Sequence, residues 1–400
     1  MKRVRKVIFW SHLISGVTAG IVIFVMSVTG VLLAFEAQIV RYAEGNMINV
    51  TPPGAKAKKL TPQELFAKLK EANPNVKPSG LTISSNPNEA ASFALGREGN
   101  LYMNPYTGQV TGDGAKTTRA FFHVVEDWHR WLGMSGGGRP VGKAITGFCN
   151  ALFLILAITG LYIWMPRKFS WQYLKSITMF KSGLKGRARD FNWHNVIGFW
   201  SALVLIFLTA TALVMSYQWA NNLLYTLTGS ELPAQQRPPQ AQGGNQNRQG
   251  RQEEAAPEIP NNLDQLFARA EEQFPNWQAI TFRPAQRKDA PVTFSVDEGR
   301  TWASFARSQL TVNAATAEVV RRETYNDYNA GRKLRSWFRF IHTGEAFGLP
   351  GQFIAGLASL GGAFLVWTGL SLAWRRFRSW KAKRAAKETD SNIEPELISD

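Results

Sequence analysis

The chain has 400 residues, with 46 lysines and arginines against 29 aspartates and glutamates, and a formal net charge of +17. Its basic residues gather beside long apolar runs, which is the positive-inside pattern of a membrane protein and not a nucleic-acid-binding face. We therefore expect a lipid bilayer and no nucleic acid as a partner. The single cysteine, Cys149, excludes an intrachain disulfide and a cysteine-ligated iron–sulfur cluster. The basic clusters are Lys2–Lys6, Arg167–Arg189 and Arg375–Lys387.

Four apolar runs are long enough to cross a bilayer as helices. The first follows a basic tip, as in a signal peptide, but it is too long for a signal-peptide core and lacks a convincing cleavage site. We expect it to be retained, with both chain termini in the cytoplasm. The runs extend from Val7 to Phe35, from Val141 to Met165, from Trp193 to Trp219 and from Phe338 to Trp374.

The polar segments between the runs predict two small modules outside the membrane, each with one amphipathic helix and several short alternating strands, one of them at Trp302–Phe305. A stretch rich in Gln, Pro, Gly and Asn between them is typical of a flexible linker. The predicted segments are span 1–40, module 41–120, span 121–166, cytoplasmic basic loop 167–190, span 191–220, linker 221–260, module 261–335, span 336–378 and cytoplasmic tail 379–400.

The two halves of the chain match each other, which predicts a mainly α fold of four membrane helices built from two repeats. Each half is a span, an outside α+β module and a second span. Alignment of His12 with His194 superposes Gly16 on Gly198 and Thr29 on Thr211, and the ends of spans two and four match as Thr159-Gly160-Leu161 and Thr368-Gly369-Leu370.

Four of the five histidines lie near the ends of the apolar runs. The predicted topology places His12 and His194 near the cytoplasmic surface, and His129 and His342 near the outer one. Two imidazoles at one depth are what a six-coordinate haem iron needs, and two layers predict two haems b about 15–20 Å apart. Small residues near the histidines leave room for the macrocycle: Ser15, Gly16, Gly133, Gly198 and Gly344.

Other interpretations exist for the same residues. A single histidine at a membrane surface is usually an interfacial anchor, but four histidines paired by depth favour ligation. Zinc or copper would also bind imidazole, although no carboxylate or thiol accompanies the histidines inside the spans. His123 competes with His129 for the outer iron, and we favour His129. Arg130 is a candidate partner of an outer haem propionate.

The motifs quoted above, together with Phe122, the Trp128-His-Arg-Trp-Leu132 stretch, Trp193-His194 and Ile341-His342-Thr-Gly344, resemble the PepSY-associated transmembrane family of bacterial inner-membrane proteins. The stretch Asn104-Pro-Tyr-Thr-Gly-Gln-Val110 resembles a PepSY domain, so that the resemblance implies two periplasmic PepSY-like modules. The resemblance also implies that family members include iron-regulated proteins and haem-containing reductases of iron–siderophore complexes. In such reductases electrons would enter from the cytoplasmic side.

We therefore expect an inner-membrane di-haem oxidoreductase that reduces a ferric siderophore or another ferric chelate and releases Fe(II). No flavin or nicotinamide fingerprint is present, so that a quinol or a cytoplasmic reductase must supply the electrons. One rival hypothesis is a non-redox PepSY protein that binds or regulates a periplasmic peptidase or peptide. Another is a transporter of the siderophore itself, for which four spans around two haems leave little room.

Overall fold

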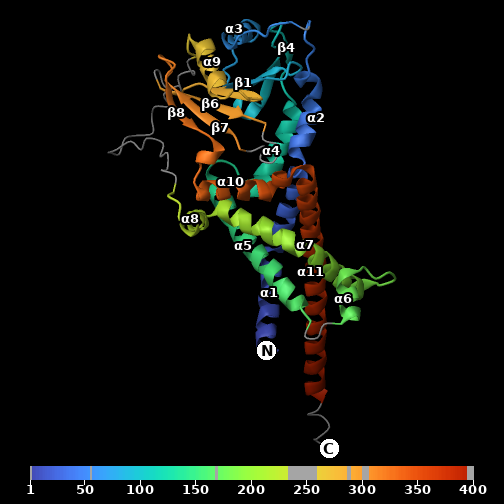
Figure 1. Ribbon diagram of the computed structural model, residues 1–400. Helices are drawn as coiled ribbons and strands as arrows, with labels where there is room; N and C mark the ends of the chain where they lie inside the picture. Colours follow the sequence, from blue (N-terminus) through green and yellow to red (C-terminus); the bar gives the residue numbers. More distant parts are fainter. Residues whose placement is uncertain are drawn as a thin grey trace, which may run out of the picture. The chain divides into compact units, whose positions relative to one another are not determined.

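The computed structural model describes residues 2–54, 56–166, 170–232, 259–285, 290–299 and 306–393. The chain divides into two compact units. Residues 1–35, 124–221 and 338–400 make the first unit, and residues 36–123 and 222–337 make the second. The first contains the long helices and the second contains the strands (Figure 1).

Four long helices form the first unit, and within the described residues there are four helices long and apolar enough to cross a membrane. Helix α1 packs against α5 and α11, and α7 packs against the same two helices. Large apolar side chains such as Ile21 and Leu203 remain exposed on the outside of the bundle, as a lipid-facing surface requires. The helices are α1 (Lys2–Leu33), α5 (Arg139–Trp164), α7 (Gly186–Ser216) and α11 (Gly348–Ile393).

The three basic clusters flank one end of this helical unit. At the start of α1, the Arg5 guanidinium donates hydrogen bonds to the carbonyls of Ile163 and Met165 at the end of α5. At the start of α7, Asp190 accepts a hydrogen bond of 2.7 Å from Ser371 and lies 3.6 Å from Arg375 of α11. Neighbouring helices therefore run antiparallel.

Two shorter helices precede α5 and α11, which corrects the predicted fourth span. That span was expected to begin at Phe338, but α10 (Ala330–Thr343) is separate from α11. Gly344, at a φ of 78°, ends α10, as Gly133, at 73°, follows the end of α4 (Lys116–Trp131). Only glycine adopts this left-handed conformation without strain, and it is the usual residue after a helix end.

Three further helices lie in segments that were predicted as loops, modules or linker. The predicted linker 221–260 begins inside α8 (Gln218–Leu227), where Leu224 and Tyr225 are buried. Residues 233–258 of that linker lie outside the described residues. The predicted basic loop contains α6 (Trp171–Thr178), and the first module begins with α2 (Glu36–Ile48).

The second unit contains one eight-stranded antiparallel sheet in the order β4-β3-β2-β1-β5-β6-β7-β8. Helices α3 (Pro62–Ala72) and α9 (Leu263–Gln273) share an apolar core with the strands, which includes Leu65, Phe93, Phe267 and Phe294. The strands are β1 (Gly80–Ser84), β2 (Ala91–Ala94), β3 (Asn100–Met103), β4 (Val110–Gly112), β5 (Ala279–Arg283), β6 (Val292–Asp297), β7 (Ser308–Val312) and β8 (Val319–Glu323).

The two predicted modules are joined into this single sheet by pairing of β1 with β5, in which Leu81 lies opposite Phe282. Among the described residues, each contributes four strands to the sheet and one helix, α3 or α9, to the shared core. The predicted strand Trp302–Phe305 lies outside the described residues. The turns before β4 and β8 share one backbone feature, because Gly108 adopts a positive φ of 72° and Ala317 one of 56°.

Candidate functional site

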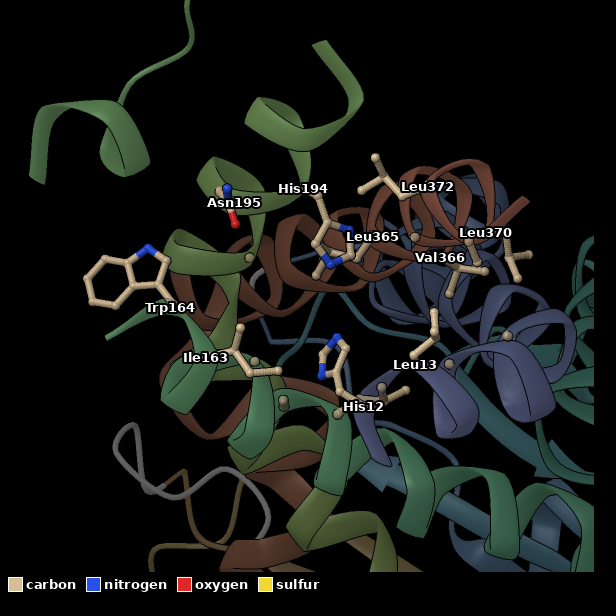
Figure 2. A pocket seen from close by; sticks show the side chains of 18 of the residues that line it. His12, Leu13, Ile163, Trp164, His194, Asn195, Leu365, Val366, Leu370 and Leu372 are labelled. Carbon is tan, nitrogen blue, oxygen red and sulfur yellow. The ribbon is translucent and has the colours of Figure 1, made fainter. Parts of the chain in front are cut away.

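The inner pair consists of His12 on α1 and His194 on α7. Their ring centroids lie 6.4 Å apart, and the ring planes cross at 86°. Figure 2 shows the two side chains pointing toward one another from their separate helices. The predicted inner layer is thus two imidazoles from two helices that are distant in sequence.

A cavity of about 310 Å³ surrounds this pair, with a lining that comes from all four long helices. Apart from the two histidines, Asn195 and two arginines, Arg187 and Arg376, the lining is predominantly apolar. Five glycines line the cavity and leave it space: Gly16, Gly20, Gly160, Gly198 and Gly369. Gly16 and Gly198, which were predicted to leave room for a macrocycle, are thus both part of the cavity lining.

The outer pair consists of His129 on α4 and His342 on α10. Their ring centroids also lie 6.4 Å apart, with an angle of 57° between the planes. Both residues belong to short helices that precede the spans, and not to the spans themselves. Burial lowers the pKa of both imidazoles, to about 4 for His129, where the nearby His342 adds to the effect. Both rings are therefore neutral at pH 7, which is the form that binds metal.

The other small residues predicted to leave room have different roles. A Cβ on Gly133 would lie 3.0 Å from the Trp128 ring, and one on Gly344 would lie 2.7 Å from the backbone of Gln352. Both glycines thus close tight turns after the outer helices. Ser15 is buried but does not line the inner cavity. For Gly133 and Gly344, the close contacts after a helix end are thus a reason for small size that involves no ligand.

Each of the four histidines forms a hydrogen bond through Nδ1 with a threonine of a neighbouring span. The Nδ1–Oγ1 distance is 2.9 Å for His12–Thr159, His194–Thr368 and His129–Thr29, and 3.3 Å for His342–Thr211. The Nδ1 of His342 also lies 2.9 Å from the carbonyl oxygen of Leu208. In all four rings Nε2 is the nitrogen that remains for another ligand. The sequence alignment paired these threonines but did not assign them a role.

Helices α1 and α7 fix the separation of the two layers. His12 and Thr29 are 17 residues apart on α1, and His194 and Thr211 are 17 residues apart on α7. At 1.5 Å per residue this spacing is about 25 Å along each helix. The layers are therefore further apart than the predicted 15–20 Å, because each outer histidine meets its threonine near the far end of a span.

The spacing within each pair fits two ligands on opposite sides of one metal ion. A metal–imidazole bond is about 2 Å, and an imidazole ring with bonds of about 1.35 Å has its centroid roughly 1.1 Å behind the bonding nitrogen. Two such rings have centroids about 6.3 Å apart, and both pairs measure 6.4 Å. The residues present therefore fit a bis-imidazole haem iron.

Each layer offers two histidines as possible ligands. Among the described residues, no group of three or more His, Cys, Asp and Glu side chains is arranged to hold a metal ion. A structural zinc site uses four protein ligands and a catalytic one uses three. A haem iron needs only the two axial ones, which is what each layer offers.

The remaining predicted site residues lie on α4. His123 precedes His129 by six residues, so that the two side chains project about 120° apart around the helix, and His129 is the one that faces His342. The Arg130 side chain is exposed, donates a 2.6 Å hydrogen bond to Glu126 and lies over the Trp131 ring. Arg187 and Arg376 at the inner cavity were not predicted, although each lies seven residues from a matched position, His194 or Gly369.

A comparison with protein-family models finds one that matches residues 9–376, the PepSY-associated TM region. The match covers nearly the whole chain and includes all the histidines discussed above. A comparison with curated proteins finds no match.

Proposed function

The chain belongs to the PepSY-associated TM region family, and from that premise we propose that it is a di-haem b oxidoreductase of the bacterial inner membrane. It passes electrons across the membrane to a periplasmic acceptor. We propose a ferric siderophore or another ferric chelate as the acceptor, whose iron takes up one electron and is released from the chelator as Fe(II). The single observation that carries the proposal is the pair spacing of 6.4 Å in both histidine layers.

Haem supplies one-electron transfer when it is bound. The residues of this chain would hold it and exclude water from it. His12 and His194 would hold the inner group, and His129 and His342 would hold the outer one. Arg187 and Arg376 line the inner cavity and would hold carboxylates there, since guanidinium groups suit carboxylate recognition. Arg130 would do the same at the outer group.

Orientation and internal symmetry belong to the same proposal. The basic clusters flank the end of the bundle where Arg5 meets α5 and Asp190 meets α11. Because positive loops stay in the cytoplasm, we assign this end to the cytoplasm, and the segments that join α1 to α5 and α7 to α11 to the periplasm. The four His–Thr pairs fall at positions that the predicted two repeats align, which supports the duplication.

A reduced-minus-oxidised absorption spectrum with a pyridine haemochrome count tests the proposal. The detergent-purified chain should carry about two haems b, and about one in His12→Ala or His342→Ala, because each variant removes one axial ligand. His123→Ala is the matched control and should retain both. A colourless protein, produced with haem in ample supply, would refute the redox function and favour a non-redox PepSY protein.

The identity of the electron acceptor has its own test. The protein is reduced without oxygen, and a ferric siderophore is then added. Reoxidation of the haem bands should coincide with the appearance of Fe(II), which a ferrous-specific chelator traps. Haem that stays reduced, although it is oxidised by other one-electron acceptors, would exclude ferric chelates as the substrate and leave the electron-transfer role in place.

A further inference from the structure

The four threonines that meet the histidines share a second contact. Each hydroxyl oxygen also lies close to the carbonyl oxygen four residues earlier in its own helix. The Oγ1–O distances are 2.7 Å for Thr29 and Val25, 2.6 Å for Thr159 and Ile155, 2.7 Å for Thr211 and Phe207, and 2.8 Å for Thr368 and Phe364.

These distances determine where the hydroxyl hydrogen lies. A carbonyl oxygen accepts hydrogen bonds and cannot donate them, so that the threonine must donate its only hydrogen to the carbonyl. Two oxygens at 2.6–2.8 Å without a hydrogen between them would repel one another. The hydroxyl can then only accept from imidazole, and the histidine Nδ1 must carry a hydrogen.

A neutral imidazole with its hydrogen on Nδ1 has its lone pair on Nε2. We propose that Thr29, Thr159, Thr211 and Thr368 are positioning residues that fix this tautomer in all four histidines and aim each Nε2 at its partner ring. The part of the inference that concerns haem rests on the proposed function. The tautomer itself depends only on the hydrogen bonds.

The group that accepts the Nδ1–H hydrogen bond also affects how strongly Nε2 of each histidine would donate its electron pair to iron. A hydrogen bond from Nδ1–H increases the basicity of Nε2, and a more basic ligand stabilises the ferric state and lowers the reduction potential. A hydroxyl is a neutral acceptor, and therefore the effect is smaller than that of a carboxylate. At His342 the Leu208 carbonyl, at 2.9 Å, shares the hydrogen bond, so that loss of the Thr211 hydroxyl should matter least there.

Threonine-to-valine variants test the inference, because valine keeps the shape and removes the hydroxyl. In a potentiometric titration followed by absorbance, Thr159→Val and Thr368→Val should each raise the midpoint potential of the same haem, the inner one. Thr29→Val should raise that of the other haem, and Thr211→Val should do so by a smaller amount. Thr159→Ser and Thr368→Ser restore a hydroxyl and should return the potential toward that of the unmodified protein.

Thr209 provides the matched control. It is buried on α7, donates to the Leu205 carbonyl at 2.7 Å and has no histidine among its described hydrogen bonds. Thr209→Val should leave both potentials unchanged. Unchanged potentials in all four test variants, or equal shifts in Thr209→Val, would overturn the positioning role.

The tautomer has a readout that does not depend on haem. Nitrogen-15 spectra of the reduced, histidine-labelled protein distinguish a protonated Nδ1 from a protonated Nε2. The four paired histidines should show the hydrogen on Nδ1, and Thr159→Val should change the signal of His12 alone. Hydrogens on Nε2 would overturn the inference even in a haem-loaded protein, whereas a colourless protein with the expected tautomers would refute only the proposed function.

Discussion

A glycine follows three of the four threonines that receive the histidines. A Cβ on Gly160 would lie 3.4 Å from Cε1 of His12, one on Gly369 would lie 3.3 Å from Cε1 of His194, and one on Gly30 would lie 3.5 Å from Cε1 of His129. The imidazole edge therefore rests against the glycine Cα while Nδ1 bonds the neighbouring hydroxyl. Each Thr-Gly pair therefore binds a histidine from another helix, by a hydrogen bond to the threonine and packing against the glycine.

This contact predicts separate effects on the two layers. In Gly369→Val the γ carbons would project into the His194 ring and turn it away from His12, since a packed interior cannot absorb the added volume. The haem count should fall from about two to about one, with the inner haem lost. Gly30→Val should lose the outer haem instead, and Gly369→Ala should keep most of the inner one. Loss of the same haem in both valine variants would contradict the assignment.

The sequence was sufficient to find the four histidines and to align the four threonines. It was not sufficient to find their hydrogen bonds, which join positions at least 100 residues apart, as in His129 and Thr29. The identical spacing of 17 residues from His12 to Thr29 and from His194 to Thr211 was the available signal. The place of Gly344 after a helix end was not predicted, because a small residue beside a histidine is consistent with either a ligand cavity or a helix end.

At the scale of elements, α4 and α10 carry the outer histidines on short amphipathic helices. The apolar run from Phe338 to Trp374 hid the division between α10 and α11 from sequence analysis, because Phe338, Phe340 and Ile341 of α10 are themselves apolar. The helix-ending signal was nevertheless present, with Gly344 followed by Pro350 near the start of α11. A break at Gly344 lets the outer histidine point across the bundle independently of α11.

Glu44 joins three elements of the second unit, α2, β3 and α4. Its carboxylate accepts two hydrogen bonds from Arg119, at 2.7 and 2.9 Å, and one of 3.0 Å from the Tyr102 hydroxyl. The Glu44 side chain is only 3% exposed, whereas that of Arg119 is 27% exposed. This bidentate pair fixes α2 against the start of α4.

Glu44→Gln should therefore destabilise the second unit. The loss should be about 2–3 kcal/mol, below the 3–5 kcal/mol of a fully buried broken pair, because Arg119 retains some access to water. Thermal unfolding of the detergent-purified chain measures it. Glu71→Gln removes a pair of 2.9 Å with Lys68 in which both side chains are largely exposed, and it should cost less than about 0.5 kcal/mol. Equal losses in the two variants would contradict the structural role of Glu44.

At the scale of the whole molecule, the predicted four spans and the two strand-containing segments between them agree with the helices and strands, but the union of the two segments in one sheet was not predicted. A sequence shows alternation along one strand and not the partner of its edge. At the seam between β1 and β5, a Cβ on Gly80 would lie 2.8 Å from the Phe282 carbonyl oxygen. Close approach of two backbones is a reason for glycine in a strand, but it does not identify the partner.

The orientation of the whole chain yields the last prediction. Cys149 is 5% exposed, so that Cys149→Ala gives a background for single-cysteine labelling with little change in packing. In that background Glu71→Cys places a thiol on α3, and Lys181→Cys places one between α6 and α7, both at exposed positions. If the basic clusters are cytoplasmic, a membrane-impermeant maleimide should label Glu71→Cys in intact spheroplasts and Lys181→Cys only after lysis. The reverse pattern would place the outer histidines in the cytoplasm and require electrons to flow in the opposite direction, whereas labelling of both in intact spheroplasts would exclude the four-span topology.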